Sequence, residues 1–218
     1  MKWGLSILLL ILCAGTINAA PPAQESVTVE PGTLELQGGF YCAAQTDCTT
    51  THETSYQDSP LHWGITEKLE YSFPLRLKYL VKSAESFQLY VGTGVFELSY
   101  SSVSGVNTLS GVDVGGKLFL PGGDSFAGSI QMKQGALVTG EESPALYFRG
   151  KAQYALQLSS SDFINVFWKQ PMDPTDSHSS TTGLGYQMAL NSSVDLQVAL
   201  LRDHLQHTGL GGNLWFRF

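Results

Sequence analysis

The residues best suited to covalent chemistry in this chain are His178 and Ser180, in the polar stretch D-S-H-S-S-T-T-G. A histidine can activate a serine hydroxyl as a nucleophile, and a carboxylate normally orients that histidine. Asp195 and Asp203 follow His178 but no glutamate does, so a His–Ser pair with a downstream glutamate is incomplete. We therefore expect a polar loop and no catalytic residues, with an esterase at His178 and Ser180 as a weak alternative.

A second group with chemical potential is formed by Cys42 and Cys48, six residues apart. In an exported protein such a pair predicts a disulfide bond. A metal site shared with His52 is the alternative, but two thiols and one histidine fall short of the four ligands that a structural zinc ion takes. The sequence thus predicts a disulfide, no metal site and no cofactor.

Export is predicted by residues 1–19, which combine Lys2, an apolar core from Leu5 to Ala14 and small residues before a cleavage site after Ala19. The mature domain would then comprise residues 20–218. The net charge of −7 argues against a nucleic-acid partner. Beyond the N-terminus, no apolar run reaches the 18 residues of a transmembrane helix.

The elements that must position any site are strands. From Leu61 to Val81 nearly every odd position is apolar, while the even positions are mostly polar. This period of two is typical of β-strands with one apolar face, and it continues well beyond the usual length of five or six residues. Two interpretations stay open: one long strand, or a tight turn at Thr66–Lys68 with strands on both sides.

The same alternation recurs to the end of the chain, with a break in phase near Gly94–Phe96 that indicates a bulge. Connections alternate between short turns, such as Pro121–Asp124 and Asn191–Ser193, and longer polar loops. That asymmetry is typical of a transmembrane barrel. The predicted fold is all-β: a single antiparallel up-and-down transmembrane β-barrel, with ten strands preferred. A second break near Pro74 would give twelve.

The last strand, Leu210 to Phe218, supports this prediction. Apolar side chains occupy alternate positions and the chain ends on Phe218. Such an ending resembles the targeting signal of outer-membrane barrels, which implies the barrel-assembly machinery as a partner, together with outer-membrane lipid and lipopolysaccharide. To close the sheet, this strand must pair with Thr33 to Tyr41.

Charged residues on the polar faces of these strands are the candidate site. Two interpretations are open: a ladder of salt bridges that plugs a structural or surface-interaction barrel, or a narrow passage for a small-molecule ligand. The predicted lumen-facing residues are Arg76, Lys78, Arg149, Lys151, Lys169, Asp195 and Arg217.

Two stretches, Val29 to Phe40 and Gly64 to Tyr71, point to a family. They resemble the opening strand and a recurrent hairpin turn of the outer-membrane transporters of phenol-degradation meta pathways. The resemblance implies a barrel that passes or binds small molecules, hydrophobic or aromatic ones among them. It also favours a hairpin turn at Thr66–Lys68, and it implies no catalytic residues.

Overall fold

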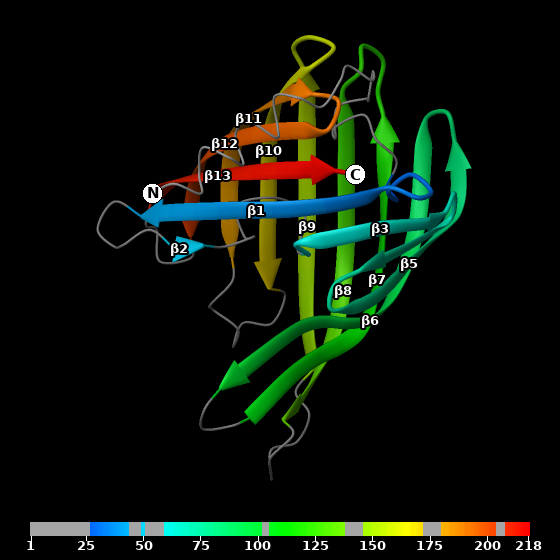
Figure 1. Ribbon diagram of the computed structural model, residues 1–218, viewed down its shortest axis with the longest axis vertical. Helices are drawn as coiled ribbons and strands as arrows, with labels where there is room; N and C mark the ends of the chain where they lie inside the picture. Colours follow the sequence, from blue (N-terminus) through cyan, green and yellow to red (C-terminus); the bar gives the residue numbers. More distant parts are fainter. Residues whose placement is uncertain are drawn as a thin grey trace.

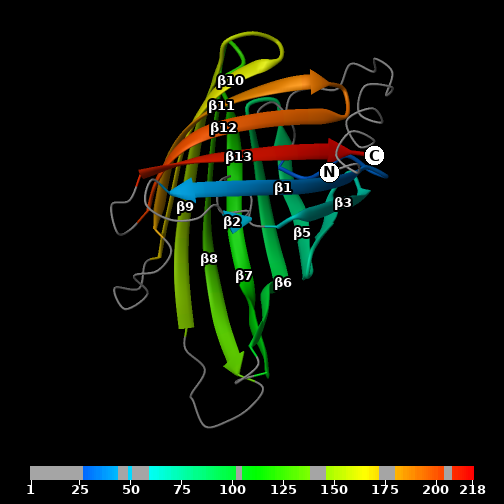
Figure 2. The same ribbon diagram turned by 60° about the vertical axis from the view of Figure 1, so that its left-hand side comes forward.

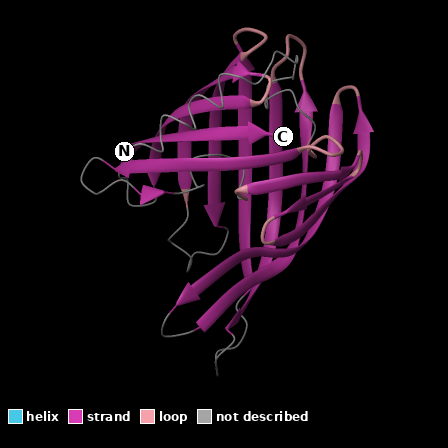
Figure 3. Ribbon diagram, in the orientation of Figure 1, coloured by secondary structure: helices cyan, strands magenta, loops and turns pink. Residues whose placement is uncertain are grey.

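A computed structural model describes residues 27–43, 49–50, 59–101, 105–137, 146–171, 180–203 and 208–218. These residues form one antiparallel sheet that curls round until its first and last strands meet (Figure 1). Strands of the near wall, β13, β1 and β3, run across those of the far wall, as expected when strands tilt around a barrel (Figure 2). None of the described residues forms a helix long and apolar enough to cross a membrane, and strands make up nearly all of the described chain (Figure 3).

The strands follow one another around the sheet in chain order, apart from the short β2. Their bounds are β1 (Leu34–Ala43), β2 (Thr49–Thr50), β3 (Leu61–Thr66), β4 (Leu69–Ser72), β5 (Leu75–Ala84), β6 (Phe87–Ser101), β7 (Gly105–Phe119), β8 (Ser125–Leu137), β9 (Leu146–Gln157), β10 (Asp162–Pro171), β11 (Thr181–Asn191), β12 (Val194–Asp203) and β13 (Thr208–Arg217).

The predicted closure by the last strand is confirmed. Strand β13 pairs antiparallel with β1 along almost its whole length, from Glu35 opposite Arg217 to Ala43 opposite Gly209. Closure satisfies the backbone hydrogen bonds that an open edge would leave exposed. Strand β2 adds only two residue pairs beside β1, so the closed wall consists of twelve strands.

The preference for ten strands is wrong, because the segment from Leu61 to Val81 contains three strands. The chain turns first at Glu67–Lys68, where the Thr66 hydroxyl oxygen accepts hydrogen bonds from the backbone N–H of Lys68 and Leu69, at 3.2 and 3.1 Å. It turns again at Phe73–Pro74, where proline has no N–H to give to a ladder. These are the two breaks of the twelve-strand alternative, and the first is the predicted hairpin.

The predicted bulge near Gly94 is also confirmed. The pairing of β6 with β7 shifts between Val95 and Glu97, and Gly94 has a positive φ of 131°. A Cβ at position 94 would lie 2.1 Å from the backbone oxygen of Leu75. The bulge turns Phe96 to the buried face of the sheet.

Two faces with opposite chemistry result from the alternation. The outer face is a continuous apolar belt, and the inner face is dominated by buried polar and charged side chains. Large exposed members of the belt include Trp63, Leu75, Leu77, Val91, Val114, Ile130, Val166, Leu184, Val198 and Leu200.

The two ends of the barrel also differ. At one end, which we call the short-turn end, brief connections lie around residues 67–68, 85–86, 120–124, 158–161 and 192–193. They include the predicted short turns at Pro121–Asp124 and Asn191–Ser193. The chain enters β1 and leaves β13 at this end, since β1 and β13 pair antiparallel there. At the opposite end, Phe73–Pro74 is the connection that lies wholly within the described residues.

Candidate functional site in the barrel interior

The predicted lumen-facing residues do not gather at one point. Five of the seven, Arg76, Lys78, Lys151, Lys169 and Asp195, are buried, and Arg149 and Arg217 are half-buried. They lie on strands from β5 to β13, so they are spread around the inner wall. The inner wall around them divides into several distinct regions.

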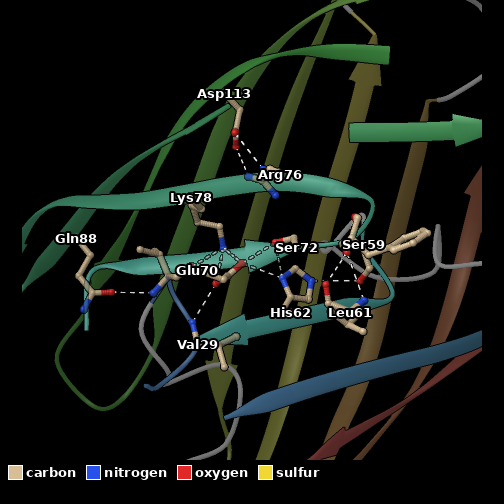
Figure 4. A network of polar contacts seen from close by, with 12 residues as sticks. Val29, Ser59, Leu61, His62, Glu70, Ser72, Arg76, Lys78, Gln88 and Asp113 are labelled. Atoms are coloured by element: carbon tan, nitrogen blue, oxygen red, sulfur yellow. Dashed lines mark hydrogen bonds and ion pairs between the residues drawn. The ribbon is translucent and has the colours of Figure 1, made fainter. Parts of the chain in front are cut away.

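The first region centres on the Glu70 carboxylate of β4, which three side chains approach (Figure 4). Its Oε1 lies 2.8 Å from His62 Nδ1 on β3 and accepts a hydrogen bond from the Ser72 hydroxyl at 2.9 Å. The Lys78 ammonium on β5 lies 2.9 Å from the same oxygen and 3.0 Å from Oε2. Glu70 is almost fully buried, so its charge is balanced by these partners and not by bulk water.

Although Ser72, His62 and Glu70 are in contact, their geometry is not that of a hydrolase. In a catalytic triad the serine and the carboxylate bind opposite nitrogens of the histidine. Here Ser72 Oγ and Glu70 Oε1 both approach His62 Nδ1, at 3.0 and 2.8 Å. The other nitrogen, Nε2, lies 3.2 Å from the backbone oxygen of Ser59. The imidazole therefore cannot accept the serine proton on one nitrogen while the acid orients the other.

The second region is the ion pair between Arg76 on β5 and Asp113 on β7. Arg76 donates through Nε to Asp113 Oδ1 at 3.2 Å and through Nη2 to Oδ2. The pair spans Gly92 of β6, where a Cβ would lie 2.0 Å from the aspartate oxygen. The Arg76 guanidinium also lies over the Phe96 ring, 5.1 Å from its centroid.

Asp113 is absent from the predicted site residues, although it is one of the most deeply buried side chains. Its signal in the sequence was an acid between Val112 and Val114, two apolar residues of the outer face. Such a position must face inward on a strand.

Further round the wall, a band of lysines extends from β7 to β10. Lys151 and Lys169 occupy directly opposite positions on β9 and β10, and both are buried. Lys117 and Lys133 lie 5.3 and 5.7 Å from the ring centroids of Phe119 and Phe96. We call Lys117, Lys133, Lys151 and Lys169 the basic band.

The third region is neutral and closes the circle from β9 to β1. Its side-chain amides form two hydrogen-bonded runs. In one, Gln153 donates to Asn165 at 3.1 Å and Asn165 donates to Gln187 at 2.7 Å. In the other, Gln37 donates to Asn213 at 3.3 Å and Asn213 donates to Gln197 at 3.1 Å. We call the six residues the amide wall: Gln153, Asn165, Gln187, Gln197, Asn213 and Gln37.

On the side of the amide wall nearer the short-turn end, Arg217 lies between two acids. Its Nη2 donates to Asp195 Oδ2, and its Nε lies 3.7 Å from Glu35 Oε2. Both carboxylates are buried. The sequence predicted Asp195 and Arg217 but missed Glu35, which sits inside β1 between outward-facing Leu34 and Leu36.

Several predictions cannot be compared with this geometry. Residues 1–19, Cys48 and His178 lie outside the described residues, so the signal peptide, the disulfide of Cys42 with Cys48 and the role of the His178–Ser180 pair stay predictions. Ser180 is described and is half-buried just before β11. Among the described side chains, no group of three or more His, Cys, Asp or Glu is arranged to hold a metal ion.

Comparison with known proteins gives a likeness of fold. The chain is similar to the NanC porin, with a TM-score of 0.53 and 12% identity over 84% of this chain and 98% of that one. It is similar to the KdgM porin, also at 0.53, with 7% identity over 85% of this chain and 99% of that one. No family model matches the chain, and no curated protein sequence matches it. The chain has the fold of outer-membrane β-barrels.

Proposed function

We propose that this protein is a small, narrow channel of the bacterial outer membrane, which passes small polar solutes and favours anions. The observation that carries the proposal is the combination of a closed apolar belt with a charged and polar inner wall. A wall of this kind is stable with lipid outside and water or a polar solute inside. A soluble barrel normally has the reverse arrangement, with its apolar face inward.

The membrane location is supported by the outer surface. Large apolar side chains point outward from every wall strand except the short β4, where Leu69 and Tyr71 are half-buried. The short turns and both ends of the barrel sheet lie together, which is the periplasmic side in bacterial barrels. The predicted signal peptide fits delivery to the outer membrane, with the barrel-assembly machinery as a partner and lipid and lipopolysaccharide as neighbours.

The preference for anions is inferred from the charges of the inner wall. The described residues include six buried basic side chains, which are Arg76, Lys78 and the four lysines of the basic band, against four buried acids. The acids are Glu35, Glu70, Asp113 and Asp195. The excess of positive charge lies along β7 to β10, and in a confined space it raises the local concentration of anions.

The NanC and KdgM porins share this fold, which supports a channel over an enzyme. The resemblance to phenol-degradation transporters points instead to hydrophobic or aromatic solutes. The charged rows of the inner wall favour polar solutes over these, since an apolar molecule would displace water from ion pairs without replacing their hydrogen bonds.

The interior is narrow, and this supports a competing function. Asn165, Gln131 and Asp113 expose 0%, 1% and 1% of their surface, so the inner side chains largely cover one another. A structural or surface-interaction barrel with a plugged lumen would show the same packing. The two functions differ in a measurable property, which is ion flow.

The test is a planar-bilayer recording of the purified protein in a salt gradient. We expect small discrete conductance steps and a reversal potential of the sign that shows anion selectivity. Changing Lys151 and Lys169 together to glutamine should shift that potential toward zero, while Lys82→Gln, an exposed residue near the short-turn end, serves as the control and should leave it unchanged. A folded protein without conductance would exclude the channel and favour the plugged barrel.

A further inference from the structure

The segment before β1, residues Val27 to Gly32, lies against the inner wall of the barrel. The Val27 N–H donates to Gln88 Oε1 at 2.8 Å, and the Val29 N–H donates to Glu70 Oε2 at 2.9 Å. In return, the Lys78 ammonium donates to the backbone oxygen of Val27 at 2.7 Å. Figure 4 shows Val29 and Gln88 at the edge of the network that Glu70 organises.

The partners of this segment identify the side on which it lies. Glu70 and Lys78 are buried inner-wall residues of β4 and β5, and Thr28, within the segment, exposes only 3% of its surface. If the segment simply extended β1 into the periplasm, Glu70, Lys78 and Thr28 would contact water instead. We call Val27–Gly32 the strap.

The wall beneath the strap is adapted to it at Gly64 of β3. The Gly32 N–H donates to the Gly64 oxygen at 2.7 Å, and Pro31 forms an isolated parallel bridge with Gly64. A Cβ at position 64 would lie 1.9 Å from the Glu30 oxygen and 2.5 Å from the Val29 oxygen. These are backbone atoms of the strap, so a side chain at position 64 could be accommodated only if the strap moved.

We propose that the strap forms the constriction of the channel near its short-turn end, and that its anchors Gly64, Glu70, Lys78 and Gln88 set how wide the passage is. The inference rests on the proposed channel function. The strap occupies part of the cross-section beside β3 to β6 and brings backbone N–H and C=O groups into the passage. Solutes that cross must pass between the strap and the opposite wall.

The strap is held mainly by polar contacts with charged or amide side chains, and this makes its position adjustable. Hydrogen bonds to ionised groups are stronger than neutral ones, yet the same groups are well hydrated if the strap leaves. The docked strap and the detached strap with hydrated anchors therefore differ little in free energy. A change at a single anchor should shift the equilibrium between them.

The experiment compares Gly64→Ala with Gly38→Ala. Gly38 is the control because a Cβ added there meets no atom within 4 Å. Docking is read in a Thr28→Cys background from the rate of labelling by a water-soluble maleimide, with protein lacking that cysteine as the blank. Passage is read from single-channel conductance. Folding is checked for every variant from the difference in gel mobility between heated and unheated samples.

We expect Gly64→Ala to raise the labelling rate about tenfold, the factor expected when one hydrogen bond to a charged group is lost, and to increase the conductance. Gly38→Ala should change neither. Should Gly64→Ala fail to fold, Gln88→Leu, which removes the acceptor of the Val27 N–H, is expected to act in the same direction.

The outcomes test the constriction by the strap and the channel function separately. Faster labelling with larger conductance in Gly64→Ala supports the constriction. Faster labelling with unchanged conductance in a conducting protein overturns it while leaving the channel intact. If no variant conducts, the channel function itself fails and the constriction fails with it, although labelling still reports whether the strap is docked.

Discussion

The two halves of the inner wall bury polar side chains in different ways. From β3 to β7 buried charges neutralise one another, as in the pairs of Arg76 with Asp113 and Lys78 with Glu70. From β9 round to β1 the amide wall adds neutral groups that donate and accept in sequence, alongside Lys151, Lys169 and the ion pairs of Arg217. In the charged half the sign of each charge fixes its partner, whereas the amides pair with one another without net charge.

This difference bears on specificity. A carboxylate tolerates only donors around it, so the partners of Glu70 are constrained, and one of them is the backbone of the strap. An amide can be rotated to exchange its donor and acceptor, so the amide wall is more tolerant. In agreement, the Nε2 group of Gln187 has no hydrogen-bond partner within the described part of the chain. We expect the charged half to be the more sensitive to single substitutions.

The largest effect is expected from Asp113→Ala. The change leaves the Arg76 guanidinium buried without its acid, and such a loss typically destabilises a protein by about 3–5 kcal/mol. The measurement is a urea titration in lipid vesicles followed by tryptophan fluorescence. The double variant Arg76→Met with Asp113→Leu removes both charges and should recover most of the loss. A loss below about 1 kcal/mol, the range of solvated pairs, would show that water already reaches the pair.

A smaller effect is expected from the matched change in the amide wall, Asn165→Ala. Asn165 is fully buried and bonds to Gln153 and Gln187. Its removal leaves one donor and one acceptor without partners, which should destabilise the barrel by about 1–3 kcal/mol in the same titration. If Asn165→Ala proved as damaging as Asp113→Ala, the contrast between the two halves of the wall would be wrong.

The sequence predicted the faces of this barrel better than its turns, and the reason is geometric. Each turn between Leu61 and Val81 has two residues, Glu67–Lys68 and Phe73–Pro74. An even number of inserted residues leaves the phase of the alternation unchanged, so Ile65 and Leu75 both face outward although two turns separate them. The pattern therefore continues through the turns and hides them.

The candidate site was predicted in part for a related reason. A charged residue at an inward position can be recognised from its neighbours, as Arg76 and Lys78 were. Which residue it pairs with depends on the register between neighbouring strands. The alternation of apolar and polar residues does not reveal that register. Arg76 meets Asp113 across 37 residues of sequence, and the strap meets Glu70 across 41. Neither contact has a local signal.

The smallest expected effect lies in the turns, where the two halves use the same device. In the turn before β8, Asp124 accepts hydrogen bonds from the Tyr154 hydroxyl at 2.6 Å and the Gln157 N–H at 2.9 Å. These bonds hold the pKa of the Asp124 carboxyl below its ordinary value of 3.8, and the bond from Tyr154 contributes most. At the corresponding turn of the amide half, Asp162 accepts from Tyr186 at 3.1 Å and from Ser159 at 2.6 Å.

A carboxyl whose pKa is lowered by folding stabilises the folded state above its unfolded pKa, and the contribution disappears as the pH falls through the lowered value. Tyr154→Phe should therefore reduce the urea midpoint slightly at pH 7, and the difference from the wild type should vanish below the lowered pKa of Asp124. Tyr186→Phe should have less effect, because Ser159, and not Tyr186, contributes most to lowering the pKa of Asp162, whereas Tyr154 contributes most at Asp124. A Tyr154→Phe difference that persisted unchanged at low pH would show that the ring packing, and not the hydrogen bond to Asp124, was responsible.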